Sequence, residues 1–416
     1  MRVFVLNSGS ASIKFKILQL PEKGDRVETE ARSLVQGELK GIGGLATLEL
    51  RTKECAPCLL EGSIRDHEEG VKWLFESLGA VDAGLLRSVE AVGLRVLHGG
   101  AVVPNAMIID DNLLAEITRL SALTPLHTPG LRAALRYARS DLRQDIPVVA
   151  VFDTAFAHAL PPRAQTYAIP QDLAARHGIR RFGFHGTAHA SVMEKYCAMT
   201  ESRSKDIRLI SLHLGSGCSA AAIQGDRCVD TSMGFTPLEG LVMGTRCGDM
   251  DPAIVSYLAR LEGVSADEVV GWLNERSGLR GMSNRSSEMR ELLDAARADH
   301  DAQAILAIDV FCYRAKKYIG AYLAALNGAN ALLFSGGIGE NSPEIRQRIC
   351  EGMSWCQLDL DTAKNEAVVG RQPTDVTRIS REGSQLEVFV VAADEETWIA
   401  HETAAVIANR RGGSRP

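Results

Sequence analysis

Two short polar segments have the composition of phosphate-binding turns. Asn7–Ser12 combines one glycine, three serines and an amide side chain between apolar runs, and Lys14 follows it. Backbone N–H groups and hydroxyls in such a turn can bind phosphate oxygens, and a lysine adds a positive charge. The second segment, Ser335–Asn341, is predicted to be a glycine loop between a strand and a helix that starts near Pro343. Serine-rich turns and tight glycine loops are also common structural features, so neither segment alone identifies a phosphate site.

A third segment, Asp230–Pro252, is dense in Gly, Thr, Asp and Pro, and is therefore a poor helix and a poor strand. Long irregular segments inside compact domains are usually functional. Arg246 lies within this one, where its planar guanidinium can bind phosphate or carboxylate oxygens. Taken alone, this arginine is equally compatible with a solvated side chain.

Three of the ten histidines and one aspartate have notable settings. His127, His185 and His213 each adjoin a turn-like motif, and none has the spacing of metal ligands. Asp153 follows the apolar run Val148–Phe152, and strand ends are where α/β proteins usually place their sites. A structural hydrogen bond would explain any one of these histidines as well.

The elements that would position these residues follow a repeated pattern. Val3–Leu6, a polar turn and an alternating run through Ile17 predict a β-hairpin, and the same pattern returns at Leu209–Ile223. The two copies are too far apart for a solenoid repeat, so each is expected to open its own domain. Further strand-like runs alternate with helical stretches, the clearest near residues 302–326, which favours α/β architecture.

Composition excludes several classes of protein. A length of 416 residues suggests two domains, and a net charge of −6 argues against a nucleic-acid or membrane-surface partner. The sequence shows no signal peptide and no membrane-length apolar run, so we expect a cytoplasmic protein. Nine cysteines fit reduced thiols. Cys55 and Cys58 have redox or half-zinc spacing, but no second pair stands at the spacing of a metal site.

Taken together, the segments resemble those of the acetate kinase family, within the superfamily of acetate and sugar kinases, actin and heat-shock ATPases. The resemblance covers almost the whole chain and runs through NSGSASIK (7–14), LRVLHGG (94–100), PLHTPG (125–130), VFDTAF (151–156), RRFGFHGTAH (180–189), the segment 230–255, GGIGENSPEIR (336–346) and ADEETWIA (393–400). It implies reversible phosphoryl transfer from ATP to acetate, giving acetyl phosphate and ADP, by direct in-line transfer.

The same resemblance implies the fold: two actin-like (ribonuclease H-like) α/β lobes with an internal duplication and the active site in the cleft between them. The expected domains are 1–152, completed by 397–416, and 153–396, which would bind the nucleotide and form a homodimer. Besides a second copy, the implied partners are acetate, ATP, ADP and acetyl phosphate.

By resemblance, the catalytic residues are Arg95, Asp153, His185 and Arg246. The arginines would bind the acid and the transferring phosphoryl group, His185 would donate to the same oxygens, and Asp153 would hold these groups in place. Mg²⁺, for which Mn²⁺ can substitute, is expected at Asn7 and Glu395. No general base is required, because the acceptor is an already ionised carboxylate.

The resemblance also assigns the binding residues. For ATP these are Ser10, Ser12, Lys14, His213, Gly215, Ser216, Gly217, Glu288, Met289, Arg290, Gly337, Ile338, Gly339 and Asn341. For the acid they are Arg95, Leu97, Leu126, His127, Phe184 and Pro237. This apolar wall would favour acetate, although one methylene is worth only about 1–3 kcal/mol.

Several positions depart from the family pattern. Ser216 stands in place of an asparagine and loses an amide donor, and Met289 stands in place of an aromatic residue and would stack less well on a base. Four other departures are Leu94, Ala101, Thr128 and Ala188. The alternatives are therefore a kinase for propionate or butyrate, an enzyme that uses pyrophosphate or another nucleoside triphosphate, and a non-catalytic actin-like ATP-binding module. A sugar kinase would need an aspartate base beside an alcohol.

Overall fold

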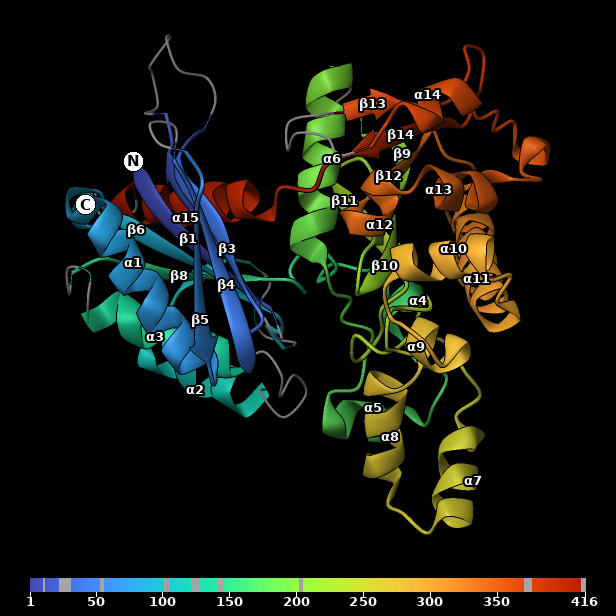
Figure 1. Ribbon diagram of the computed structural model, residues 1–416, viewed down its shortest axis with the longest axis horizontal. Helices are drawn as coiled ribbons and strands as arrows, with labels where there is room; N and C mark the ends of the chain where they lie inside the picture. The colour runs from blue at the N-terminus through green and yellow to red at the C-terminus, as the bar shows by residue number, and fades with distance from the viewer. Residues whose placement is uncertain are drawn as a thin grey trace. The chain divides into compact units, whose positions relative to one another are not determined.

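The structure is a computed structural model that describes residues 1–9, 12–21, 31–52, 56–100, 103, 105–120, 128–140, 142, 145–201, 205–369 and 376–412. It divides into two compact units: unit 1 is Met1–Ala155 with Asp394–Pro416, and unit 2 is Phe156–Ala393 (Figure 1). The sequence analysis placed these boundaries at residues 152 and 397, so Asp153 and Glu395 belong to unit 1 here. Predicted residues Ser10, Leu126 and His127, together with Cys55, lie outside the described residues.

Unit 1 is a sheet with helices on both faces. Its elements are β1 (Arg2–Ser8), β2 (Ser12–Gln19), β3 (Arg32–Lys40), β4 (Gly44–Thr52), β5 (Cys58–Ile64), α1 (His67–Arg87), β6 (Ala91–Val96), β7 (Met107–Ile108), α2 (Asp111–Leu120), α3 (Thr128–Ser140), β8 (Val148–Phe152) and α15 (Glu395–Gly412). In the described part of the chain the strand order is β5-β4-β3-β2-β1-β6-β8-β7, and β1, β6 and β8 run parallel.

Alternation along β1 explains how the sheet is covered. Successive side chains of a strand point to opposite faces. Phe4 and Leu6 belong to the core cluster that contains residues of α1 and α3. Val3 and Val5 belong to a second cluster with residues of α15. The C-terminal helix therefore packs on one face of this sheet and α1 and α3 on the other.

Unit 2 repeats this plan with more helices. Its elements are α4 (Pro162–Gln165), α5 (Gln171–His177), α6 (Gly186–Thr200), β9 (Arg208–Leu214), β10 (Cys218–Gln224), β11 (Arg227–Thr231), α7 (Ala253–Glu262), α8 (Ala266–Glu275), α9 (Gly278–Ser283), α10 (Met289–Ala298), α11 (Ala302–Leu326), β12 (Ala331–Ser335), α12 (Gly336–Asn341), α13 (Pro343–Cys350), the 3₁₀ turn η2 (Ser354–Cys356), α14 (Thr362–Glu366), β13 (Val376–Arg378) and β14 (Glu387–Val391). Among the described residues its strand order is β11-β10-β9-β12-β14-β13.

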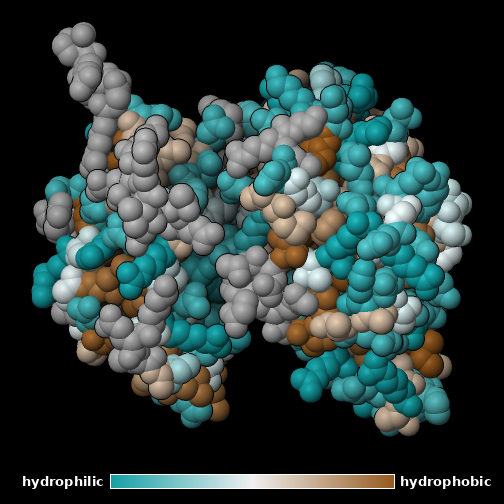
Figure 2. Space-filling model, turned by 90° about the horizontal axis from the view of Figure 1, so that it is seen from above, coloured by the Kyte–Doolittle hydropathy of each residue, from teal (hydrophilic) through white to brown (hydrophobic). Residues whose placement is uncertain are grey.

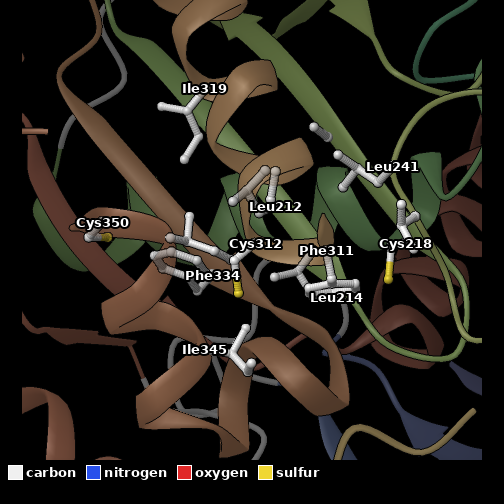
Figure 3. Packing of buried hydrophobic residues seen from close by; sticks show 14 of the residues in the cluster. Leu212, Leu214, Cys218, Leu241, Phe311, Cys312, Ile319, Phe334, Ile345 and Cys350 are labelled. Atoms are coloured by element: carbon white, nitrogen blue, oxygen red, sulfur yellow. The ribbon is translucent and has the colours of Figure 1, made fainter. Parts of the chain in front are cut away.

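The larger core of unit 2 lies between this sheet and helices α10, α11 and α13. Figure 3 shows Leu212 and Phe334 of the strands beside Phe311 and Ile319 of α11. The opposite face of the sheet packs on residues of α6, in a second cluster. Because both faces are covered, β12 is buried along its whole length and β9 along most of its length.

The predicted strands at 148–152, 331–334 and 386–392, and the helix at 302–326, are confirmed within a few residues. The predicted glycine loop at Ser335–Asn341 is wrong, because residues Gly336–Asn341 form the helix α12. Gly336 takes the turn from strand to helix at φ +77°, a conformation that favours glycine. The helix that follows begins at Pro343, as predicted.

Hydrophilic residues predominate on the face seen in Figure 2, with apolar residues in smaller patches among them. None of the described helices combines the length and the apolar character needed to span a bilayer.

Candidate active site

Arg95 and Asp153 form a bidentate ion pair where two parallel strands of unit 1 end. Arg95 Nε donates to Asp153 Oδ1 at 2.9 Å, and Nη2 donates to Oδ2 at 2.5 Å. Arg95 pairs with Val151 across the β6–β8 register, which places Asp153 at the same edge of the sheet. Burial by itself would lower the pKa of Arg95, but Asp153, with smaller contributions from Glu395 and Glu396, raises the pKa above its ordinary value. Arg95 is therefore a fixed cation in a set orientation.

Asn7 and the first turn of α15 complete this cluster. Arg95 Nη1 donates to Asn7 Oδ1 at 2.9 Å, and Asn7 Nδ2 donates to Glu396 Oε1 at 2.8 Å. Glu395 lies on the other side, with Oε2 at 3.5 Å from Arg95 Nε. Predicted metal residues Asn7 and Glu395 therefore both contact Arg95, and Asn7 also binds the neighbouring glutamate, which the sequence analysis did not single out.

Two lysines on β2 lie near the same acidic turn. Lys16 Nζ forms a buried ion pair with Asp394 Oδ1 at 2.5 Å, and Asp394 also accepts from Thr397 at the start of α15. Lys14 is exposed. Although the residue is exposed, loss of water around its ammonium group would lower the pKa of Lys14; the carboxylates of Glu396, Glu395 and Glu38 together raise the pKa above its ordinary value. Ser12 opens β2, where its carbonyl oxygen accepts from Gly9 N at 2.8 Å. Lys14 is thus a cation available to a phosphate.

In unit 2, His185 lies at the beginning of α6 with φ +57°. Its Nδ1 lies 2.9 Å from Ser219 Oγ, and the same hydroxyl lies 2.8 Å from Nε2 of His189. Nδ1 of His189 lies 2.8 Å from Ser211 Oγ. This buried chain ties the predicted catalytic histidine to strands β9 and β10.

Arg246 differs from Arg95 in having no carboxylate ion pair among the described residues. Its Nη1 donates to Pro237 O at 3.2 Å and lies 3.7 Å from Met243 Sδ. Burial lowers its pKa. A cation held against neutral acceptors in this way favours an anionic ligand.

The β9–β10 turn brings Arg246 and His185 together. A Cβ atom built on Gly217 would lie 3.2 Å from His185 Nε2 and 3.7 Å from Arg246 Nη1. The ring of His213 lies 5.1 Å from that of His185, and its Nδ1 lies 3.2 Å from Ser335 Oγ. Two side chains that donate to anions therefore converge beside a glycine.

The predicted acid-pocket residues are divided between the units. Phe184 is buried in the larger core of unit 2, and Pro237 is half-buried and contacts Arg246 through its carbonyl oxygen. Leu97 is buried in unit 1, next to Val96 at the end of β6. In sequence, Phe184 directly precedes His185, Pro237 lies nine residues before Arg246, and Leu97 follows Arg95 after Val96.

A cavity of about 900 Å³ lies wholly within unit 2. Eight predicted nucleotide-binding residues line it: Gly215, Ser216, Glu288, Met289, Arg290, Gly337, Ile338 and Asn341. Both departures from the family pattern that concern the nucleotide, Ser216 and Met289, are among them. His213, Gly217 and Gly339 are not among its lining residues; a Cβ on Gly339 would meet Phe334 and Leu214, so its free side faces the core.

A buried arginine supports one wall of this cavity. Arg346 donates from Nη1 to Gly339 O and Glu340 O, at the C-terminal end of α12, and from Nη2 to Val368 O at 2.9 Å. Its Nε donates to Asn365 Oδ1 at 2.7 Å. All these acceptors are neutral, and burial lowers the pKa of Arg346 to about 10. Arg346 thus joins α12 to the segment that carries Glu366 and Val369, which also line the cavity.

The sequence analysis missed His189, Glu396 and Arg346. His189 could have been found from the sequence, because it lies four residues after His185. Residues four apart on a helix lie on the same face. Glu396 adjoins the predicted Glu395, and only the packing of α15 decides which of the two meets Asn7. Nothing in its local sequence distinguishes Arg346 from a solvated helix residue.

Comparison with known proteins gives one consistent result. Residues 2–401 match the family described as the acetokinase family. The acetate kinase of Streptomyces coelicolor is 44% identical over 98% of this chain and 97% of its own length. The acetate kinase of Chloroherpeton thalassium is 41% identical over 97% and 98% of the two chains.

Solved structures agree with this match. A Porphyromonas gingivalis acetate kinase is similar with a TM-score of 0.84 and 36% identity, over 98% of this chain and 99% of its own. A Francisella tularensis propionate kinase is similar with a TM-score of 0.86 and 34% identity, over 97% and 99%. These similarities confirm the predicted actin-like α/β fold, and the repeated strand order confirms the internal duplication.

Proposed function

This chain belongs to the acetokinase family, and we propose that it transfers the terminal phosphoryl group of ATP reversibly to the carboxylate of acetate. The match over residues 2–401 carries this proposal. The two arginines support it, because an anionic acceptor and a phosphoryl group each need a cationic partner.

In unit 1, Arg95 would bind the acid or the transferring phosphoryl group. Asp153 fixes the plane of its guanidinium, and Asn7 fixes one end of it. Because this geometry is set before the substrate binds, little reorganisation would remain during the reaction. Asp153 would act as a positioning residue and not as a base.

In unit 2, Arg246 and His185 would donate to the equatorial oxygens of the phosphoryl group. Charge on these oxygens is greatest in the transition state, so preorganised donors lower the barrier. The acceptor is an ionised carboxylate, and no side chain needs to remove a proton from it. We therefore propose direct in-line transfer without a phosphorylated enzyme.

The cavity of unit 2 would hold the nucleotide. Its lining combines apolar Met289 and Ile338 with Arg290 and the turn residue Ser216, which suits a base and its phosphates. A methionine packs less specifically on a base than an aromatic ring does. We therefore expect weaker discrimination among purine nucleotides, which a comparison of ATP with GTP as donors would measure.

The acidic turn of unit 1 fits Mg²⁺. Asn7 Oδ1 and the carboxylates of Glu395 and Glu396 offer oxygen atoms, the donors that Mg²⁺ prefers. Among the described residues no three His, Cys, Asp or Glu side chains form a complete metal site. Mg²⁺ commonly uses one or two carboxylates together with substrate phosphates, so this donor set is adequate. When bound, Mg²⁺, or Mn²⁺ in its place, would offset the charge of the phosphates.

The choice of acid is the main alternative, because the similar Francisella tularensis structure is that of a propionate kinase. Hydroxylamine trapping of the acyl phosphate, with ATP, Mg²⁺ and acetate, propionate or butyrate, tests the reaction directly. We expect the highest kcat/KM with acetate. A higher kcat/KM with propionate would make propionate, and not acetate, the preferred substrate. If no acid yields an acyl phosphate, the proposed function is wrong.

We also propose a homodimer formed through unit 2. On α7, Ile254, Tyr257 and Leu261 lie at helical spacing, and each is at least 40% exposed. An exposed apolar stripe of this kind often marks an interface. Light scattering after size-exclusion chromatography should give the mass of a dimer, and Tyr257→Lys should shift it toward a monomer. A monomeric wild type would contradict this proposal.

We propose a cytoplasmic location, where ATP is available and thiols stay reduced. The cysteines that the structure describes are free thiols, among them Cys247 in the active-site segment. Cell fractionation with antibody detection would test the location, and recovery outside the cytoplasm would contradict it.

A further inference from the structure

Below the predicted catalytic histidine lies a continuous chain of four polar side chains. It runs from Ser211 on β9 through His189 on α6 and Ser219 on β10 to His185, with donor–acceptor distances of 2.8, 2.8 and 2.9 Å. Ser211 and Ser219 are fully buried and His189 is 1% exposed. Bulk water therefore does not reach these groups.

The direction of this chain follows from its buried end. Each serine hydroxyl has one proton, so the neutral chain has two possible orders. Within the described residues, Ser211 Oγ has one hydrogen-bond partner, His189 Nδ1. If His189 Nδ1 donated to Ser211, the serine proton would be buried without an acceptor, at a cost of about 1–3 kcal/mol. Ser211 therefore donates to His189.

The remaining protons then have fixed positions. A neutral His189 that accepts at Nδ1 carries its proton on Nε2 and donates it to Ser219 Oγ. The proton of Ser219 can then go only to Nδ1 of His185. A neutral His185 that accepts at Nδ1 carries its own proton on Nε2.

Nε2 of His185 faces the place where the anion-binding groups converge. It lies near Gly217 and Arg246, as measured from the Cβ position at Gly217. Among the described residues of unit 2, titratable and charged groups near His185 include His189 on α6, His213 on β9 and Arg246 in the segment after β11. A neutral donor is favoured here, because an imidazolium beside the Arg246 guanidinium would add like-charge repulsion.

We propose that Ser211, His189 and Ser219 are positioning residues that fix the tautomer of His185, so that the neutral imidazole donates from Nε2 to the transferring phosphoryl group. The role in transfer rests on the proposed function. The tautomer itself does not, because it follows from the hydrogen-bond chain alone.

The first test is spectroscopic and independent of activity. In the full-length protein labelled with ¹⁵N-histidine, NMR at about pH 8 reports which ring nitrogen carries the proton. The His185→Gln and His189→Gln variants assign the two signals. We expect both rings to be protonated at Nε2. A proton on Nδ1 of His185 would overturn the proposal, whatever reaction the protein catalyses.

The second test is kinetic. Ser219→Ala removes the donor to His185 Nδ1, so part of the neutral His185 population would adopt the other tautomer. We expect kcat at about pH 8 to fall about 10-fold to 100-fold, since a wrong histidine tautomer can cost far more in other enzymes. At a pH low enough to protonate His185, the imidazolium carries a proton on both nitrogens, and the deficit relative to wild type should shrink. The KM for ATP should change little.

The matched control is Ser191→Ala. Like Ser219, Ser191 is a buried serine, but it lies on α6, and its hydroxyl donates to Ala188 O in the same helix and not to the hydrogen-bond chain described above. We expect wild-type kinetics from it at each pH. Unchanged kcat in Ser219→Ala, or a deficit that is the same at every pH, would overturn the positioning role. A wild type that phosphorylates no acid would instead overturn the proposed function and leave the NMR result as the test of the tautomer.

Discussion

The two units share one sheet topology, but they carry different polar side chains at equivalent strand positions. In unit 1 the strand order β3-β2-β1-β6-β8-β7 matches β11-β10-β9-β12-β14-β13 in unit 2, with the same parallel and antiparallel pairs. The sheet of unit 1 contains two further strands, β4 and β5, beyond β3. The duplication therefore concerns the backbone topology, and any chemical difference between the units must come from the side chains at equivalent positions.

Register identifies these positions. Leu6 pairs with Leu94 across β1 and β6, so Asn7 and Arg95 follow as the next pair, whereas His213 pairs with Ser335 across β9 and β12. Each pair is joined by a side-chain hydrogen bond. The same location thus holds a guanidinium and an amide in one unit and an imidazole and a hydroxyl in the other.

The neighbouring positions continue the contrast. Lys14 pairs with Asn7 in the first hairpin, and Ser219 pairs with His213 in the second. Unit 1 therefore places charge directly on its strands. In unit 2 the equivalent strand position holds the uncharged Ser219, and the cation Arg246 comes from an irregular segment. A strand covered on both faces tolerates charge only when a partner is built in, as Asp153 is for Arg95.

Arg95→Ala should show the largest effect, because it removes a cation that we propose to be catalytic and also leaves Asp153 without its bidentate partner. We expect kcat to fall about 100-fold or more and the free energy of unfolding to fall by about 3 kcal/mol. Hydroxylamine trapping and urea denaturation measure the two effects. Arg95→Ala/Asp153→Asn should regain much of the stability and none of the activity; equal stability of the single and double variants would contradict the pairing argument.

Arg246→Ala should separate activity from stability. We expect a similar loss in kcat, about 100-fold or more, but a change in the free energy of unfolding below about 1 kcal/mol. The reason is that Arg246 pairs with no described carboxylate and its burial lowers its pKa. Arg260→Ala, on the exposed side of α7, is the matched control. A large loss of stability in Arg246→Ala would remove the distinction between the two arginines.

Arg346→Met tests a third kind of arginine, one that is fully buried and donates to several neutral oxygen atoms. Its loss leaves the carbonyl oxygens of Gly339 and Glu340 unpaired, which should lower the free energy of unfolding by about 2 kcal/mol. Because Arg346 holds α12 against the opposite wall of the cavity, we expect the KM for ATP to rise about 10-fold with the KM for acetate unchanged. Arg348→Met, on the same helix and paired with Glu344, should change neither by much. A rise in both KM values would argue against a role confined to the nucleotide cavity.

The smallest expected effect concerns His98 of unit 1. Burial, and secondarily the charge of Arg119, lowers the pKa of His98 to about 4. An unfolded histidine titrates near pH 6.5, so the unfolded state takes up its proton first as the pH falls. Stability should therefore decrease between about pH 6.5 and pH 4, by about 2 kcal/mol on going from pH 7 to pH 5. His98→Asn should reduce this slope in urea denaturation, and an unchanged slope would exclude His98 as its source.

Local pattern predicted much of the scaffold. Alternation and apolar runs gave both hairpins and the central strands, and helical spacing gave α11, because these signals depend on neighbours a few residues apart. The short helix α12 was predicted as a loop, since three of its six residues are glycine. Arg346 binds carbonyl oxygens at its end and stabilises a helix that its own residues do not favour.

The sequence by itself determined the family and the reaction class, and it predicted the reactive residues, since these follow from residue types in order along the chain. Tertiary structure decided which groups meet. Asn7 and Glu396 are 389 residues apart, yet they share a hydrogen bond because α15 packs on the sheet that begins with β1. Likewise, the direction of the hydrogen-bond chain below His185 depends on the burial of Ser211, which no local pattern encodes, because burial is a property of the whole packed unit.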